Sequence, residues 1–226
     1  MKLTPKTIAV LKNFNSINQS ICFDPGNTLR TMSFTRSVIA QAEVDVKFNT
    51  SFCIYDISRF LNVLGLLSDP EIEASEKTVT IKNNKANITY MCSARNLILT
   101  APDPKKTLVL PEKSICSFTL KNEDVQQLLK AMAILGLPEI AIVGEDGQLH
   151  LKGIDSNGKI QDNYSLTIGE NKKNFKAVFK TDNFNKLMPG DYNVRIDKIK
   201  GVNISHFRND ADKIEYYIAV DQSSDL

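Results

Sequence analysis

Apolar residues recur at helical spacing in four separate stretches of the chain. In residues 52–67, FCIYDISRFLNVLGLL, a short apolar run precedes Asp56, and the apolar positions of 57–64 then fall on one face of a helix. Asp56 suits the N-cap position because its side-chain oxygen accepts hydrogen bonds from the free N–H groups of a first turn. This stretch therefore predicts a strand that ends at Tyr55, followed by an amphipathic helix.

The same arrangement of cap and amphipathic helix occurs three more times. It predicts a helix in residues 3–14 with the cap Thr4, and a strand, a cap and a helix in residues 117–135 and 177–188 with the caps Asn122 and Thr181. The helical starts lie near residues 4, 57, 122 and 181, and the roughly 60 residues between successive starts are β-like and rich in turns. We interpret the chain as four copies of one unit that consists of a helix and several strands.

Short segments of alternating apolar and polar residues predict antiparallel strands with one face in water. The turn residues 25–27, PGN, are expected to join residues 17–23 and 28–46 as a hairpin, and EDG at 145–147 to join 139–143 and 148–154. Further strands are expected in residues 71–75, 79–81, 86–92, 164–168, 175–179, 192–196, 202–207 and 214–220. So many strands with four helices predict an α+β architecture.

Residues 97–113, LILTAPDPKKTLVLPEK, interrupt the repeats. They contain three prolines, which lack the N–H group that a central strand donates, so the segment is expected to be an extended connection or an edge strand. It divides the chain into an N-terminal domain, 1–96, and a C-terminal domain, 114–226, with two of the four units in each. We call residues 97–113 the connector.

The composition bears on three questions: membrane insertion, export and the state of the cysteines. No apolar run of the 226 residues approaches the roughly 20 that a membrane span needs, and the N-terminus lacks the apolar block of a signal peptide, so we expect no export. Four cysteines are scattered along the chain without a C-x-x-C pair. In a chain that is not secreted, such cysteines are usually reduced and behave as small hydrophobes.

Signatures of catalysis are missing from the sequence. It contains no G-x-x-x-x-G-K-[ST] phosphate loop, and His150 and His206 lie far from any cysteine at zinc spacing. We therefore expect no enzyme activity, no metal and no cofactor, although a catalytic site assembled from distant residues stays open.

Charge is distributed unevenly, although the net charge is only +2. Beyond their first turns the four predicted helices carry no acidic residue, and their basic residues are Lys6, Lys12, Arg59, Lys130 and Lys186. These five bases could simply be solvated surface residues. The alternative is a shared surface for a polyanion, since lysine and arginine separated by amides suit phosphate contacts that carry no sequence information.

Several stretches resemble the DNA sliding clamps of T4-type bacteriophages, the polymerase processivity factors of the proliferating-cell-nuclear-antigen-like clamp fold. The resemblance covers essentially the whole chain and lies in an ordered set of segments: MKLTPKTIAVLKNFNSIN, IYDISRFLNVLGLL, EDVQQLLKAMAILGL, YSLTIGE, MPGDYNVRI and YYIAVDQSSDL. It implies a two-domain clamp fold in which three chains close head to tail into a ring, with helices lining the channel and antiparallel sheets outside.

The resemblance also implies partners and a location. The expected partners are double-stranded DNA without sequence preference, the replicative DNA polymerase, an ATP-driven clamp loader and late-transcription factors. The ring would tether the polymerase and hydrolyse nothing itself. The expected location is the cytoplasm of the infected bacterial host.

Site residues follow from the same resemblance. Lys6, Lys12, Arg59, Lys130 and Lys186 would face DNA in the channel, and Lys2 and Lys121 are further candidates. A groove for partner peptides would lie beneath the connector, lined by Leu97, Ile98, Leu99, Leu108, Val109 and Leu110, with Tyr217 and Ile218 as its floor. Alternatively, the apolar connector residues only pack down to shield the junction of the domains.

Two other functions compete with the clamp. One is a non-enzymatic, sheet-rich structural or assembly protein of a virion, which has no need for acid-free helices. The other is a small enzyme, which the lack of a nucleophile, metal or phosphate motif disfavours.

Overall fold

The computed structural model describes residues 1–108, 110–199 and 201–226. The chain forms two compact units: residues 1–103 with 212–214, and residues 104–211 with 215–226. We call them the N-terminal unit and the C-terminal unit. The division at 103/104 falls inside the connector.

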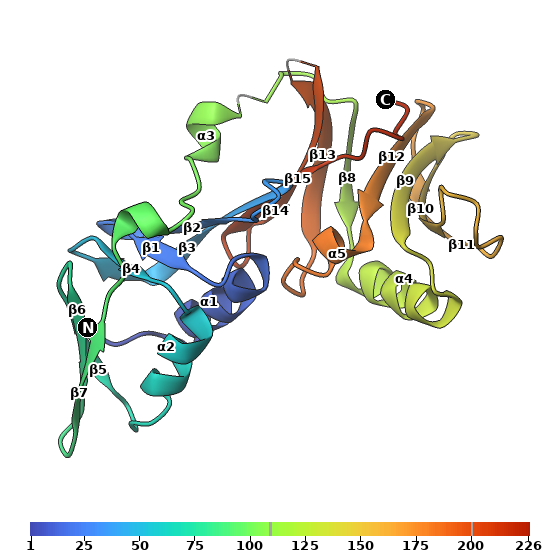
Figure 1. Cartoon of the computed structure of the whole chain (residues 1–226). Helices are drawn as coiled ribbons and strands as arrows, with labels where there is room; N and C mark the ends of the chain where they lie inside the picture. The colour runs from blue at the N-terminus through green and yellow to red at the C-terminus, as the bar shows by residue number, and fades with distance from the viewer. Residues whose placement is uncertain (109, 200) are drawn as a thin grey trace. The chain divides into compact units, whose positions relative to one another are not determined.

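The N-terminal unit places its helices against antiparallel strands (Figure 1). Its elements are α1 (Pro5–Ile17), β1 (Ile21–Phe23), β2 (Gly26–Met32), β3 (Val38–Phe48), β4 (Phe52–Ile54), α2 (Ile57–Leu64), β5 (Glu71–Ala74), β6 (Thr78–Lys82), β7 (Asn87–Met91) and the 3-10 turn η1 (Arg95–Leu97). Strands β2 and β3 pair, as do β1 and β4, and β5, β6 and β7 form a three-stranded sheet. Helix α1 packs against β2 and β3 and contacts α2.

The predicted caps of the first two helices are confirmed. The Thr4 hydroxyl accepts from the Thr7 N–H at 3.1 Å, and Pro5 occupies the first helical position. The Asp56 carboxylate accepts from the Arg59 N–H at 2.8 Å. Local chemistry thus decides where these two helices begin.

The hairpin expected at residues 25–27 is wrong. Strand β1 pairs with β4 instead, and β2 pairs with β3. Gly26 has a φ of 122°, a conformation that side-chain-bearing residues rarely adopt, and it lies where the chain passes from β1 into β2. Phe23 stacks on Phe52 of β4 with ring centroids 4.4 Å apart, so a contact between distant residues selects the partner.

Two of the four cysteines do not follow the expected reduced state. Cys22 and Cys53 face each other across β1 and β4 and form a disulfide, while Cys92 and Cys116 are free. The expectation was wrong because it rested on sequence spacing, whereas the pairing of β1 with β4 brings residues 31 positions apart to directly opposite places.

The C-terminal unit contains two antiparallel sheets and a long helix. Its elements are α3 (Pro104–Thr107), β8 (Cys116–Leu120), α4 (Asn122–Leu135), β9 (Glu139–Glu145), β10 (Gln148–Ile154), β11 (Tyr164–Glu170), β12 (Phe175–Lys180), α5 (Thr181–Phe184), β13 (Tyr192–Ile199), β14 (Val202–Asn209) and β15 (Ile214–Ala219, from residue 215 on). One sheet has the order β11-β10-β9-β12, and the other includes β15-β14-β13-β8.

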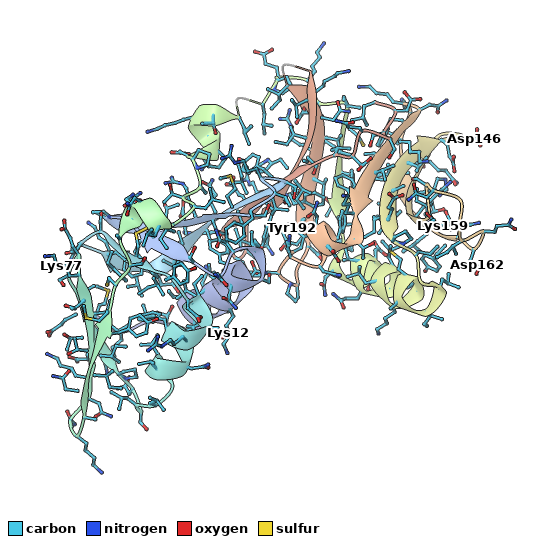
Figure 2. The ribbon with its side chains drawn as sticks, in the orientation of Figure 1. Lys12, Lys77, Asp146, Lys159, Asp162 and Tyr192 are labelled. Carbon is cyan, nitrogen blue, oxygen red and sulfur yellow. A yellow bond between two sulfur atoms is a disulfide. The ribbon has the colours of Figure 1, made fainter. Side chains whose placement is uncertain are left out.

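Aromatic rings fill the core of the C-terminal unit. Phe184 of α5 contacts Phe179 of β12 and Phe207 of β14, with centroid distances of 5.3 and 5.4 Å. Tyr192, which Figure 2 labels, is 2% exposed and packs edge-on against Phe207 at 6.3 Å. Strands of both sheets and α5 therefore share one apolar interior.

The last two helices begin differently from the prediction. Asn122 is the first residue of α4, and Asp191 accepts from its N–H at 2.9 Å, so a distant carboxylate supplies the cap. Helix α5 is a single turn, Thr181–Phe184, preceded by Lys180 at the N-cap position, and it does not extend to residue 188 as expected. In place of the expected amphipathic helix there is one helical turn, and its Phe184 ring packs against Phe179 and Phe207.

Candidate functional site

Helix α1 presents basic residues on the side opposite its buried face. It buries Val10, Leu11 and Phe14 and has no acidic residue. Lys12 is exposed and Lys6 is partly exposed, and across the described residues neither forms a salt bridge. Figure 2 labels Lys12 on α1. Both charges are therefore available to an external anion.

Helices α2 and α4 each contribute one exposed base in the same way. Arg59 lies on α2, and its guanidinium carbon is 5.8 Å from the centre of the Tyr90 ring, which holds the side chain by a cation–π contact. Lys130 lies on α4 and, among the described residues, forms no salt bridge. The acidic residues of α4, Glu123 and Asp124, lie in its first turn. Positive charge therefore dominates the exposed remainder of both helices.

The other candidate lysines differ in their surroundings. Lys2 bonds to Asp69, and Lys121 bonds to Asp191 at 2.8 Å; each hydrogen bond raises the pKa of its lysine. These lysines are already balanced by carboxylates of the same chain, so a phosphate would have to compete for them. Lys186 is partly buried and follows the end of α5.

Connector residues proposed for the peptide groove lie in unequal environments. Leu97 is 66% exposed and Ile98 is 7% exposed, while Leu99, Leu108 and Leu110 are partly exposed. Val109 lies outside the described residues. The two proposed floor residues alternate along β15, so Tyr217 and Ile218 point to opposite faces of the sheet. Ile218 is fully buried, and only one of the two can face such a groove.

Ion pairs fasten the connector within each unit. In the N-terminal unit, the Arg95 guanidinium donates to both oxygens of Asp24 at 2.6 and 3.0 Å. This bidentate contact holds the pKa of Asp24 below its usual range. Arg30 adds a salt bridge of 3.3 Å to Asp103.

In the C-terminal unit, Glu215 makes the contacts that hold the connector. Its carboxylate lies 3.8 Å from the Lys105 Nζ of α3, 3.2 Å from the His206 Nε2 and 3.1 Å from the Tyr217 hydroxyl. The His206 and Tyr217 rings stack with centroids 4.5 Å apart. Beside them, the Arg195 Nη2 donates to the Pro111 carbonyl at 2.7 Å.

Sequence analysis missed the residues that hold the connector. Arg95 and Asp24 are 71 positions apart, and Arg195 and Pro111 are 84 apart. No local pattern marks such pairs, although a lone arginine next to an apolar, proline-rich segment is a weak signal for a fastening of this kind.

Comparison with known proteins identifies the family. Residues 2–98 match the family described as DNA polymerase processivity factor, and residues 117–222 match the family described as gp45 sliding clamp, C terminal. A sliding clamp of Vibrio phage KVP40 is 31% identical over 226 residues, covering 98% of this chain and 99% of that protein. The chain belongs to the sliding clamp family.

Other relatives extend this result. The sliding clamp of Enterobacteria phage T4 is 30% identical over 202 residues, which is 85% of each chain. The protein is thus a sliding clamp, a DNA polymerase processivity factor of the phage type, and the alternative of a virion component is not favoured.

Solved structures show the same fold at low sequence identity. A Helicobacter pylori beta clamp bound to a DNA ligase peptide aligns with a TM-score of 0.69 and 16% identity, over 98% of this sliding clamp and 65% of that chain. The proliferating cellular nuclear antigen of Entamoeba histolytica aligns with a TM-score of 0.66 and 16% identity, over 95% and 94% of the two chains. The expected α+β clamp fold is confirmed.

No group of three or more His, Cys, Asp or Glu side chains within the described residues is placed to hold a metal ion. In the same part of the sliding clamp, no helix is long and apolar enough to cross a membrane.

Proposed function

We propose that three copies of this sliding clamp close into a ring around duplex DNA and tether the replicative polymerase to its template. The observation that carries the proposal is the set of helix surfaces that are free of acidic residues beyond the first turn and whose lysines form no salt bridge within the described residues: Lys6 and Lys12 on α1 and Lys130 on α4. Two clamp units per chain, each with at least one such helix, would give a ring of six similar units.

Phosphate contacts without base contacts suit a protein that must move along DNA. Lysine and arginine bind backbone phosphates of any sequence, and the released counterions make the affinity depend on salt. Arg59 adds a base whose stacking on Tyr90 limits its rotamers. Lys186, Lys2 and Lys121 are secondary candidates, because the last two are engaged with Asp69 and Asp191.

Ring closure would use unpaired sheet edges. Strand β7 is at one edge of its described sheet and β11 at one edge of another. Exposed apolar residues accompany these edges: Met91 ends β7 and is 69% exposed, and Ile134 lies near the end of α4, which packs on β11, and is 84% exposed. Pairing of β7 with β11 of the next copy would satisfy both edges and cover this apolar surface.

A Helicobacter pylori beta clamp of the same fold binds a DNA ligase peptide. In this clamp, partner peptides would dock at the connector. Leu97, Leu99, Leu108 and Leu110 are the accessible apolar candidates in the described residues, whereas Tyr217 on β15 is buried and would have to be uncovered by the peptide. An ATP-driven loader would open the ring, since the proposed role of the clamp is tethering without catalysis. The work would take place in the cytoplasm of the infected bacterial host.

Topological retention on DNA tests this proposal. The clamp is loaded with its loader onto nicked circular DNA, freed of unbound protein by gel filtration, and the DNA is then cut once with a restriction enzyme. A ring is expected to stay on the circle and to leave after linearisation, at moderate salt. Equal retention on circular and linear DNA would show ordinary binding and overturn encirclement.

A further inference from the structure

A pair of cysteines lies next to the first residues of the connector. Cys22 on β1 and Cys53 on β4 are directly opposite in the antiparallel register, with Cα atoms 4.0 Å apart. Each of these strands has only three residues. Because a pairing of this length is weak by itself, the disulfide is a large part of what holds the two strands together.

The backbone of Cys53 connects this pair to the connector. Its carbonyl accepts from the Ser93 N–H at 2.8 Å, and Ser93 lies two residues before the turn Arg95–Leu97. On the other strand, Asp24 lies two residues after Cys22 and binds Arg95 through both carboxylate oxygens. Each strand of the disulfide-linked pair therefore holds one point of the segment 93–95.

Access to the two sulfur atoms is unequal. Cys53 is 3% exposed, whereas Cys22 is partly exposed and lines a small cavity of about 30 Å³ together with Arg95 and Leu99. Burial raises the pKa of Cys92, and it raises the pKa of Cys116 to about 11. Both free thiols are therefore poor nucleophiles for exchange within the chain, and an external thiol has its clearest route to Cys22.

We propose that Cys22 and Cys53 form a redox-responsive staple that sets how firmly residues 93–99 are held to the N-terminal unit. In the oxidised form the staple fixes β1 to β4, and with them the Ser93 and Arg95 contacts. In the reduced form these contacts depend on the short strand pair and the stacking of Phe23 on Phe52, and residues 93–99 separate from the N-terminal unit more often. The proposal rests on contacts within one unit and does not depend on ring formation or on DNA.

Reduction follows ordinary thiol–disulfide exchange with a dithiol. One thiolate of the dithiol attacks the Cys22 sulfur, the Cys53 sulfur leaves as a thiolate and takes up a proton, and a mixed disulfide remains at Cys22. The second thiolate of the reagent then attacks its own sulfur in that bond and releases Cys22. The protein gains two protons and two electrons, and the reagent becomes a cyclic disulfide. Glutathione disulfide reverses the change and yields two glutathione thiols.

Hydrogen exchange of the whole chain in glutathione redox buffers tests the staple. Alkylation and mass spectrometry give the oxidation state of Cys22 and Cys53 in each buffer. The amides of Ser93, Leu97 and Ile98, which donate to Cys53, Ala94 and Arg95, are expected to exchange about tenfold faster after reduction. Amides of β9 in the C-terminal unit serve as the internal reference and are expected to stay within twofold.

Cysteine variants give the matched controls. Cys92→Ala is expected to keep the full redox response, because Cys92 is free. Cys22→Ala is expected to show fast exchange at residues 93–98 in both buffers. If that variant does not fold, Cys22→Ser provides the same comparison, since the site is only partly buried.

Three results would overturn the proposal. Equal exchange at residues 93–98 in oxidised and reduced protein would show that the disulfide does not hold this segment. An equal increase in β9 would show a general loosening of the chain. Two thiols that stay reduced in buffer dominated by glutathione disulfide would show that the pair is no redox couple.

Discussion

Lysines of this clamp divide into two groups according to their neighbours. Lys12 and Lys130 lie on helices without a carboxylate bound to them in the described structure, whereas Lys2 and Lys121 each bind an aspartate of the same chain. A lysine that already bonds to a carboxylate gains less from a phosphate, because it must give up that contact. The first group should therefore contribute most of the DNA affinity.

Charge reversal tests this division at the residue scale. Lys12→Glu with Lys130→Glu should leave the chain folded but reduce loading and processive synthesis, most strongly at raised salt. The logarithm of DNA affinity falls linearly with the logarithm of salt concentration, and each lost phosphate contact should make this slope shallower by about 0.9. The measurement is product length in primer extension across a salt series.

Lys77→Glu is the matched control for that experiment. Lys77 is exposed in the turn between β5 and β6, away from Lys12 in Figure 2. The control should synthesise like the parent protein. Unchanged product lengths for the double variant at every salt concentration would remove these two lysines from the DNA interface.

Asp191 gives a residue-scale prediction about acid. The hydrogen bonds from Lys121 and from the Asn122 N–H hold the pKa of Asp191 below its usual range. The native state thus favours the carboxylate, so its stabilisation of α4 is complete above the ordinary aspartate pKa of about 3.9 and is lost as the pH falls through the lowered native value.

Unfolding of Asp191→Asn across pH checks this sign. The variant should be less stable than the parent near pH 7, and the difference should shrink as the pH falls below about 4. Denaturant titrations followed by circular dichroism give both free energies of unfolding. A gap that widens toward acid would mean that Asp191 does not cap α4 as a carboxylate.

At the scale of elements, the connector is an apolar segment that ion pairs hold in each unit. Arg95, just before the connector, pairs with Asp24 in the N-terminal unit, and Lys105, within it, pairs with Glu215 in the C-terminal unit. The connector leucines, Leu97, Leu99, Leu108 and Leu110, remain exposed or partly exposed, which suits a surface that receives a partner peptide.

Shortening two of those leucines tests the groove. Leu108→Ala with Leu110→Ala should weaken binding of the polymerase's clamp-binding peptide by roughly tenfold or more, since each removes apolar contact area. Fluorescence anisotropy with a labelled peptide measures the affinity. Ring mass should stay the same, and an unchanged peptide affinity would place the groove elsewhere.

Sequence could predict the elements whose cause is local. Thr4, Pro5 and Asp56 mark the starts of α1 and α2 by their own chemistry, and EDG at 145–147 forms the turn between β9 and β10, with Asp146 and Gly147 at φ of 50° and 80°. The apolar periods also located α4.

Features that depend on contacts between residues far apart in the sequence could not be predicted. The partner of β1 depends on Phe23 meeting Phe52, the disulfide depends on that pairing, and the cap of α4 comes from Asp191, 69 positions away. Among the candidate site residues, the exposed positions of Lys12 and Lys130 were predictable from helix periodicity. Glu215 and His206 were not, because their roles arise from β14 and β15 lying together.

On the scale of the whole molecule, the proposed ring depends on surfaces that a single chain leaves uncovered. Met91 at the end of β7 and Ile134 on α4 are the candidates, since each is a large, exposed apolar side chain next to an edge strand. Three chains of 25.3 kDa would give a particle of about 76 kDa.

Sedimentation equilibrium over a range of concentrations measures that assembly. The parent should approach the trimer mass at high concentration and lose mass on dilution if its interfaces are modest. Met91→Glu and Ile134→Glu should each shift the equilibrium toward 25.3 kDa, because every contact in a head-to-tail ring repeats the same substitution.

Phe34→Ser supplies the control for apolar exposure alone. Phe34 is 68% exposed but lies in the turn between β2 and β3 and belongs to neither β7 nor β11. It should sediment like the parent. A parent chain that remains monomeric at all concentrations would keep the clamp fold but remove encirclement, whereas a trimer unaffected by Met91→Glu and Ile134→Glu would assign the ring contacts to other surfaces.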